Sequence, residues 1–162
     1  MRWLRHLFAP AAHGAFPEAT LQRIGDAVAQ GETRHRGEVC FAVEAALPLA
    51  ALRAGLDAQA RARQVFAQLR VWDTQANNGV LVYLLLADRR IEIVADRGLD
   101  GRVSAEQWRG ACQLMEERLR AGDAEDAGIA GVRAVSDLLA AHFPRAPGQA
   151  DANELPDRPR ML

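Results

Sequence analysis

The stretch at residues 72–98, W-D-T-Q-A-N-N-G-V-L-V-Y-L-L-L-A-D-R-R-I-E-I-V-A-D-R-G, decides the fold. At its centre, residues 80–87 form an unbroken apolar run, and the length and the Val, Leu and Tyr content of this run predict a β-strand buried on both faces. A short polar turn at residues 88–90 separates it from a second, mostly apolar strand at residues 91–95. Because so few residues connect the two runs, we expect them to pair as an antiparallel hairpin.

Polar residues flank both strands of this predicted hairpin. In an antiparallel pair, the start of the first strand lies beside the end of the second, so the flanking segments meet at one rim of the sheet. An error of one or two residues in register leaves this conclusion unchanged. The residues expected at this rim are Asp73, Asn77, Asn78, Asp96, Arg97 and Asp100.

Amphipathic segments surround the hairpin on both sides. Their apolar residues recur at helical spacing, and Ser104 with Gln107 forms a capping box that marks one helix start. The predicted elements are helices at residues 17–31, 57–72, 104–122 and 125–141, and a half-buried strand at residues 38–44.

Together these elements predict an α/β fold with a single domain, in which a small mixed β-sheet is sandwiched between helices. The strand at residues 80–87 should be central, because only helices on both sides of a sheet hide both of its faces. We expect an N-terminal arm at residues 1–16 and the α/β domain at residues 17–145. Residues 146–162 hold several prolines and no apolar period, which predicts an extended, weakly ordered tail.

Composition excludes some classes of function. The formal net charge of the 162-residue chain is −1, which argues against a nucleic-acid-binding protein. All of the basic residues are arginine, so no lysine can serve as a nucleophile or general base. Cys40 and Cys112 lie far apart, and we expect two reduced thiols packed in the core. Cys112 and Arg118 share the spacing of cysteine phosphatases, but both fall inside a predicted helix whose amides are already bonded.

The N-terminal segment has two interpretations. It lacks the apolar core of a signal peptide, and no stretch of the chain is apolar for long enough to span a bilayer, so we expect a soluble, cytoplasmic protein. Residues 1–9 either pack as an arm on their own domain or make a weak membrane-surface contact, peripheral to the inner membrane. In this segment apolar side chains alternate with basic ones: Trp3, Leu4, Leu7 and Phe8 with Arg2, Arg5 and His6.

The oxygen-rich rim is the candidate site of this sequence. Carboxylates and carboxamides suit a hard cation such as Ca²⁺ or Mg²⁺ better than Zn²⁺, which prefers His and Cys. Residues 96–107 partly resemble a calcium loop, although Gly98 and Gln107 stand where ligands are expected. In the alternative, Asp73 caps a turn, Asn77 to Gly79 form one, and Asp96 pairs with an arginine. The candidate metal ligands are Asp73, Asn77, Asn78, Asp96 and Asp100, with Arg97 as the candidate anion-binding residue.

No catalytic constellation accompanies the rim. The sequence lacks the motifs of serine hydrolases, P-loop NTPases, zinc proteases and dinucleotide-binding enzymes. None of the four histidines is spaced so as to pair with a serine or carboxylate: His6, His13, His35 and His142.

The stretch at residues 72–98 resembles the TPM domain family. The resemblance covers most of residues 17–145, and it is strongest to a short bacterial subgroup that keeps the N-E-L-P-D-R-P stretch at residues 153–159 and lacks an export signal. It implies a sheet between helices, a divalent cation at acidic loops on the sheet rim, and acid-phosphatase activity in some members. By position, the family's rim falls on Asn78, Gly79, Asp96, Arg97, Gly98 and Asp73.

This chain departs from most of the family at two points. Asp-Arg-Gly at residues 96–98 replaces a Gly-aromatic-Gly turn, and the export signal is missing. Both departures weaken the transfer of a phosphatase activity and of a location outside the cytoplasm.

Three functional hypotheses therefore stand. We favour a binding or scaffold domain that holds a divalent cation at the rim and works with protein partners near the cell envelope, because no nucleophile and base lie together. The second is a metal-assisted phosphomonoesterase, in which the ion activates a water, Arg97 clamps the phosphate, and Asp96 or Asp73 is a metal ligand. The third is a structural domain with no ion.

Overall fold

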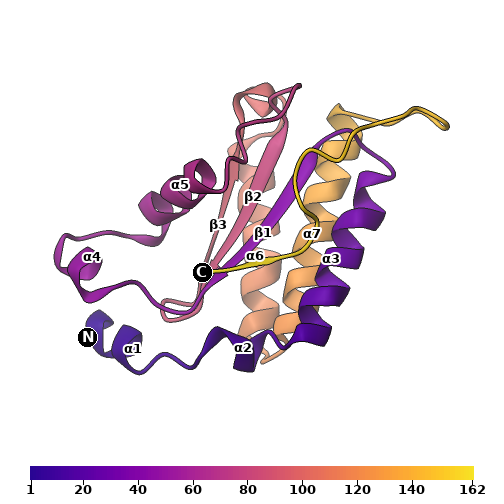
Figure 1. Cartoon of the computed structure of the whole chain (residues 1–162). Helices are drawn as coiled ribbons and strands as arrows, with labels where there is room; N and C mark the ends of the chain where they lie inside the picture. Colours follow the sequence, from indigo (N-terminus) through magenta and orange to yellow (C-terminus); the bar gives the residue numbers. More distant parts are fainter.

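A four-stranded mixed sheet forms the centre of the computed structural model, which describes all 162 residues (Figure 1). Its strands lie in the order β3-β2-β1-β4, and β1 pairs in parallel with both β2 and β4, while β2 and β3 are antiparallel. The predicted mixed sheet, the hairpin and the central position of its first strand are confirmed. The strands are β1 (Glu38–Glu44), β2 (Gly79–Leu85), β3 (Arg90–Ala95) and β4 (Arg160–Met161).

Helices cover both faces of this sheet (Figure 1). One face packs against α3 (Glu18–Glu32), α6 (Ala105–Arg120) and α7 (Ala124–His142). The other face packs against α5 (Ala58–Gln68). Three short helices complete the chain: α1 (Arg2–Leu7), α2 (Ala12–Ala15) and α4 (Leu49–Arg53), the first and third of which lie side by side. None of the helices combines the length and the apolar character needed to cross a membrane.

Alternation along β2 explains its unbroken apolar run. Successive side chains of a strand point to opposite faces of the sheet. Val80, Val82 and Leu84 pack in the core under α3, α6 and α7, whereas Leu81 and Tyr83 pack in the core under α5. Because β2 has buried cores on both sides, each of its positions is apolar.

The helix predicted at residues 57–72 ends earlier than expected. α5 stops at Gln68, and Arg70 adopts a left-handed backbone with φ of 55°, which ends the helical turn. The chain then buries Val71 and leaves Trp72 47% exposed, so Trp72 is not part of the apolar stripe of the helix.

The prediction that β1 is half-buried is wrong. All seven residues of β1 are buried, because α5 and the C-terminal tail with Leu155 cover the face that was expected to meet solvent. Glu44 is tolerated there because its carboxylate accepts hydrogen bonds from Arg61 at 2.8 Å and from the Tyr83 hydroxyl at 2.6 Å.

The C-terminal tail is extended and contacts β1 along its length. Leu155 is buried in the core under α5, and its amide donates to a carboxylate oxygen of Glu38 at 3.0 Å. Farther on, Arg160 and Met161 form β4 beside β1. These contacts were not anticipated, because a single anchor residue and a two-residue strand produce no periodic pattern.

Candidate functional site

The predicted rim exists at the end of the sheet where β2 begins and β3 ends. Val80 pairs with Ala95, and one step beyond, the amide of Asp96 donates to the carbonyl of Gly79 at 2.9 Å. Asn78 and Asp96 therefore lie at the same end of the sheet, as the hairpin predicts. We call this end, with residues 71–79, 96–100 and the neighbouring residues 31–38, the rim end.

Close backbone contacts tie the two segments of the rim together. The amide of Gly98 donates to the Asn77 carbonyl at 2.8 Å, and a side chain at Gly98 would overlap this carbonyl and lie 2.7 Å from that of Ala76. Asn77 itself has a φ of 51°, in the left-handed region where asparagine is common. The rim is therefore held mainly by main-chain groups, with no space for a Cβ at Gly98.

Asp96 is the most buried acidic group of the predicted site, with 9% of the residue exposed. One of its oxygens accepts the amide of Arg97 at 2.7 Å and caps the short 3-10 helix η1 (Arg97–Leu99). The other oxygen is buried and has no hydrogen-bond partner. A buried carboxylate oxygen without a donor is costly, unless a cation or a water satisfies it.

Asn78 is fully buried and connects three segments. Its side-chain amide donates to the Arg36 carbonyl at 2.8 Å, and its main-chain amide donates to the Thr74 hydroxyl at 3.1 Å. Its side-chain oxygen is buried and has no partner. Since Asp96 pairs opposite Gly79, strand alternation assigns the side chains of Asn78 and Asp96 to opposite faces of the sheet end. They share the rim, but they approach it from different sides.

Of the remaining predicted site residues, Asp73, Arg97 and Asp100 are exposed and Asn77 is partly buried. Asp73 pairs with Arg70 at 2.6 Å, and Asp100 also faces solvent. The guanidinium of Arg97 donates to the Asn77 side-chain oxygen at 3.2 Å. No group of three or more His, Cys, Asp and Glu side chains is arranged to hold a metal ion. The five predicted ligands therefore do not form one cluster, and Asp96 is the acidic residue among them with a buried oxygen that has no partner.

Two further buried polar side chains lie beside the start of β1, and no pattern in the sequence indicates them. His35 and Ser136 are both fully buried next to Gly31. Nδ1 of His35 donates to the Gly37 carbonyl at 3.0 Å, so Nε2 is an acceptor, and it has no partner. The Ser136 hydroxyl also has none. Burial lowers the pKa of His35 to about 4, so the ring is neutral at physiological pH.

Two glutamates at this end hold β1 and the tail in place. Glu32 accepts the amide of Val39 at 3.0 Å, and Glu38 accepts that of Leu155 at 3.0 Å. Burial raises the pKa of Glu32 to about 8, and it also raises the pKa of Glu38 above its ordinary value. Glu38 lies far from its partner Leu155 in the sequence, and Glu32 belongs to no motif. No sequence signal therefore identifies either glutamate.

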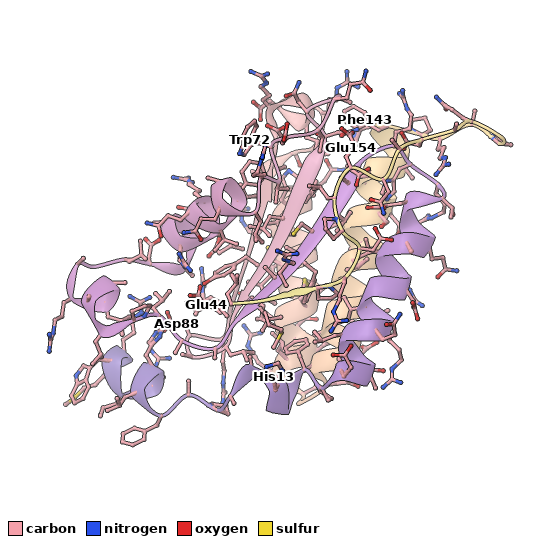
Figure 2. The ribbon with its side chains drawn as sticks, viewed as in Figure 1. His13, Glu44, Trp72, Asp88, Phe143 and Glu154 are labelled. Carbon is pink, nitrogen blue, oxygen red and sulfur yellow. The ribbon has the colours of Figure 1, made fainter.

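The buried side-chain polar atoms that have no hydrogen-bond partner all lie at the rim end: Nε2 of His35, Oδ1 of Asn78, Oδ2 of Asp96 and Oγ of Ser136. In Figure 2 the labels Trp72, Phe143 and Glu154 mark this end. Glu44 and Asp88 lie at the opposite end of the strands. Native proteins satisfy nearly all such atoms with protein, water or ions, so these four atoms are available to contact a water or an ion.

Comparison with known proteins places this arrangement in a family. A sequence profile of the TPM domain matches residues 11–138. The chain belongs to the TPM domain family. This membership confirms the resemblance carried by the hairpin and its Asn-Asn-Gly turn, and it applies to most of the α/β domain.

Solved structures share the fold of this TPM domain. The NMR structure of the BA42 protein from the psychrophilic bacterium Bizionia argentinensis has a TM-score of 0.77 and 25% identity, with 89% of this chain and 93% of that chain covered. The solution NMR structure of the N-terminal domain of a P. gingivalis protein has a TM-score of 0.63 and 18% identity, with 82% of each chain covered. No protein of curated function matches the chain.

Proposed function

We propose that this TPM domain is a binding module that holds a divalent cation at the rim end, on the carboxylate of Asp96, and acts with protein partners near the cell envelope. The observation that carries the proposal is the buried oxygen of Asp96 that receives no hydrogen bond. The protein partners and the location near the cell envelope are inferred from the resemblance to the TPM family.

The donor chemistry of the rim favours Ca²⁺ or Mg²⁺. Around Asp96 the available ligands are carboxylate and main-chain oxygens, and hard cations prefer these donors. Ca²⁺ accepts irregular sets that include main-chain carbonyls and water, which suits a rim with one buried acidic group and several carbonyls. Asp73 and Asp100 are exposed nearby on the same loops and are candidates for additional ligands.

Thermal unfolding of the full chain with and without CaCl₂ or MgCl₂ tests the cation. At a hundredfold excess over Kd, binding to the native state alone adds about 2.7 kcal/mol, which corresponds to about 5–10 °C for a domain of this size. Asp96→Asn keeps the shape of the side chain and should remove most of the gain. Asp26→Asn is the matched control, because Asp26 is exposed on α3 and bonds only to Gln22. A melting temperature that does not respond to either ion contradicts the proposal.

Arg97 favours a second function, a metal-assisted phosphomonoesterase. Its guanidinium is exposed beside Asp96 and bonds to the neutral Asn77, so no carboxylate neutralises its charge. A cation on Asp96 and this guanidinium together would bind a phosphate. Ion-dependent hydrolysis of an aryl phosphate, lowered by Arg97→Ala and unchanged by Arg109→Ala on α6, would support it. Activity that survives Arg97→Ala points to a contaminant.

A further inference from the structure

The N-terminal helix α1 uses one of its faces to attach to the domain. The guanidinium of Arg2 donates to the Asp88 carboxylate at 2.7 and 2.9 Å and to the Leu56 carbonyl at 2.7 Å. One turn later, Nδ1 of the buried His6 accepts the amide of Leu47 at 2.9 Å, so Nε2 carries a proton and donates to Asp88 at 3.0 Å. These polar contacts fix α1 on the β2–β3 turn.

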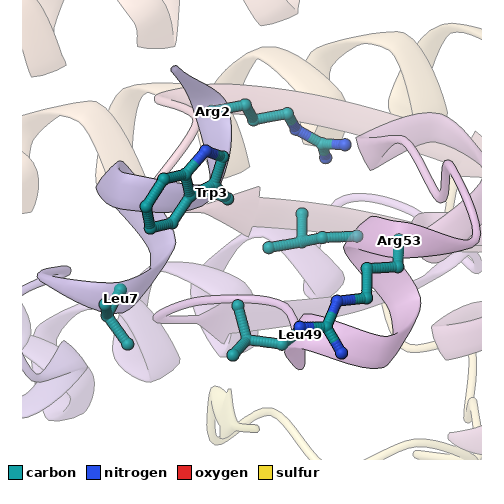
Figure 3. A pocket seen from close by; sticks show the side chains of 6 residues that line it. Arg2, Trp3, Leu7, Leu49 and Arg53 are labelled. Atoms are coloured by element: carbon teal, nitrogen blue, oxygen red, sulfur yellow. The ribbon is translucent and has the colours of Figure 1, made fainter.

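The other face of α1 is apolar and exposed. Trp3 is 49% exposed, Leu7 55% and Phe8 76%, and Leu49 at the start of α4 is 43% exposed. Between the two helices lies an open groove of about 510 Å³ (Figure 3), lined by Arg2, Trp3, Leu7, Leu49, Leu52 and Arg53. Most of the exposed large hydrophobic residues of the chain are gathered here, which is unusual for a surface that meets only water. We call this surface the α1–α4 face.

The charges of the α1–α4 face are positive. Residues 1–17 contain two arginines and no acidic residue, and residues 45–56 contain one arginine and no acidic residue. Arg5 and Arg53 are exposed and form no ion pair, whereas Asp88 pairs with Arg2 and accepts a hydrogen bond from His6. Asp57 and Glu92 line a polar hollow together with Arg2, Arg5 and Asp88, and none of the residues that line the apolar groove is acidic. A chain with a net charge of −1 thus presents a local basic and apolar surface.

We propose that the α1–α4 face docks reversibly on an anionic phospholipid surface. Trp3, Leu7 and Phe8 would enter the interfacial layer, where aromatic side chains partition well, and Arg5 and Arg53 would meet lipid phosphates. The shape also fits, because α1 and α4 form a corner of the molecule away from α3 and α7 (Figure 1). Since the β2–β3 turn and the rim lie at opposite ends of the sheet, docking leaves the rim end facing away from the lipid.

Vesicle co-sedimentation of the full chain tests the docking. The chain should sediment with vesicles of phosphatidylglycerol and phosphatidylcholine, sediment less with phosphatidylcholine alone, and be released by salt, which screens charge attraction. The double variant Trp3→Ser/Phe8→Ser should bind about tenfold more weakly or worse, and Arg5→Glu should lose the preference for anionic lipid. Trp72→Ser is the matched control, because it removes an equally exposed tryptophan at the rim end and should bind normally.

Fluorescence locates the contact independently of these losses. In a Trp72→Phe/Trp108→Phe protein, Trp3 is the sole tryptophan, and its emission should shift to shorter wavelength when anionic vesicles are added. Unchanged emission with bound vesicles would place the contact elsewhere and overturn the proposal. Wild-type protein that does not sediment with anionic vesicles also overturns it, including the case in which the chain associates with itself and the face is a protein interface.

Discussion

The two ends of the β-sheet are stabilised by different chemistry. At the rim end, main-chain groups cross-link the loops, glycines allow the close approach, and buried oxygens of Asn78 and Asp96 have no partner. At the opposite end, which carries α1, α4 and the β2–β3 turn, the side chains of Arg2 and His6 bind Asp88 with every polar atom of that carboxylate used.

The rim end therefore has polar atoms that can bind a ligand, whereas at the other end the polar atoms attach α1 to the domain. Polar atoms that are already paired within the protein add little affinity for a ligand, whereas unpaired buried atoms bind one without first breaking a bond. At the α1 end the polar groups are consumed by the attachment, and the exposed surface that remains is apolar and basic. The rim end therefore suits a small polar ligand or an ion, and the α1–α4 face suits an extended surface.

Gly79→Ala should have the largest effect on stability, because it disrupts the backbone contacts of the rim end. An added Cβ would overlap the carbonyl oxygen of Val71, which is a main-chain atom and cannot turn aside as the end of a flexible side chain can. We expect a loss of about 4 kcal/mol or more in the free energy of unfolding, measured by urea denaturation. Gly110→Ala is the control, since Gly110 is exposed in α6 with open space around it, and this change should stabilise by about 0.5–1 kcal/mol. Similar effects at the two positions would show that the rim tolerates rearrangement.

Asp88→Ala should have the next largest effect and act at the other end. The substitution leaves the buried His6 and the partly buried Arg2 without their acceptor, which we expect to cost about 3 kcal/mol. Hydrogen exchange should accelerate in residues 2–8 and stay unchanged at residues 77–79. If α1 keeps its protection, side-chain contacts to Asp88 are not what attaches it.

The same carboxylate predicts an acid response. Burial alone would raise the pKa of Asp88, but hydrogen bonds from Arg2 and His6 outweigh burial and hold the pKa below its ordinary value. A depressed pKa means that the stabilisation is complete above about pH 4 and is lost as pH falls through the folded value. The protection of the amides of residues 2–8, measured as exchange relative to the intrinsic rate at each pH, should therefore fall in acid, with little further change in Asp88→Ala.

The elements that the sequence predicted well are those governed by local periodicity. The hairpin followed from two apolar runs and a short turn, and the Ser104–Gln107 capping box followed from adjacent residues. The shared location of Asn78 and Asp96 followed from hairpin geometry alone. These features depend on neighbours that are close in sequence, so a single chain reveals them.

Distant partners account for what the sequence could not reveal. His6 bonds to residues 41 and 82 positions away, and nothing around it marks it as buried. Leu155 is an anchor only because Glu38, 117 residues earlier, accepts its amide. The rim was predicted as one cluster of ligands, but strand alternation at Gly79 divides it between two faces, and Asp73 turns outward to Arg70. Whether a side chain is buried, and to which face of the sheet it points, is decided only when the whole sheet has assembled.

Glu32→Gln should have the smallest effect, and it tests whether the rim end carries a buried acid that is protonated near neutral pH. Burial, and secondarily the nearby Glu38 and Asp157, raise the pKa of Glu32 to about 8 from an ordinary value of 4.5. Between these values the folded state binds more protons than the unfolded state, so stability contributed by this group falls as pH rises from about 4.5 to 8. Glutamine keeps an oxygen for the amide of Val39 and removes the titration.

Thermal unfolding at pH 5, 7 and 9 distinguishes a Glu32 that is protonated near neutral pH from one that is ionised. The variant should match wild type at pH 5 and exceed its stability by about 2 kcal/mol at pH 9, because a charged carboxylate is no longer buried there. Glu106→Gln, exposed in the first turn of α6, should leave the pH profile of wild type unchanged. Parallel profiles for wild type and Glu32→Gln would mean that Glu32 is ionised and solvated in the folded state.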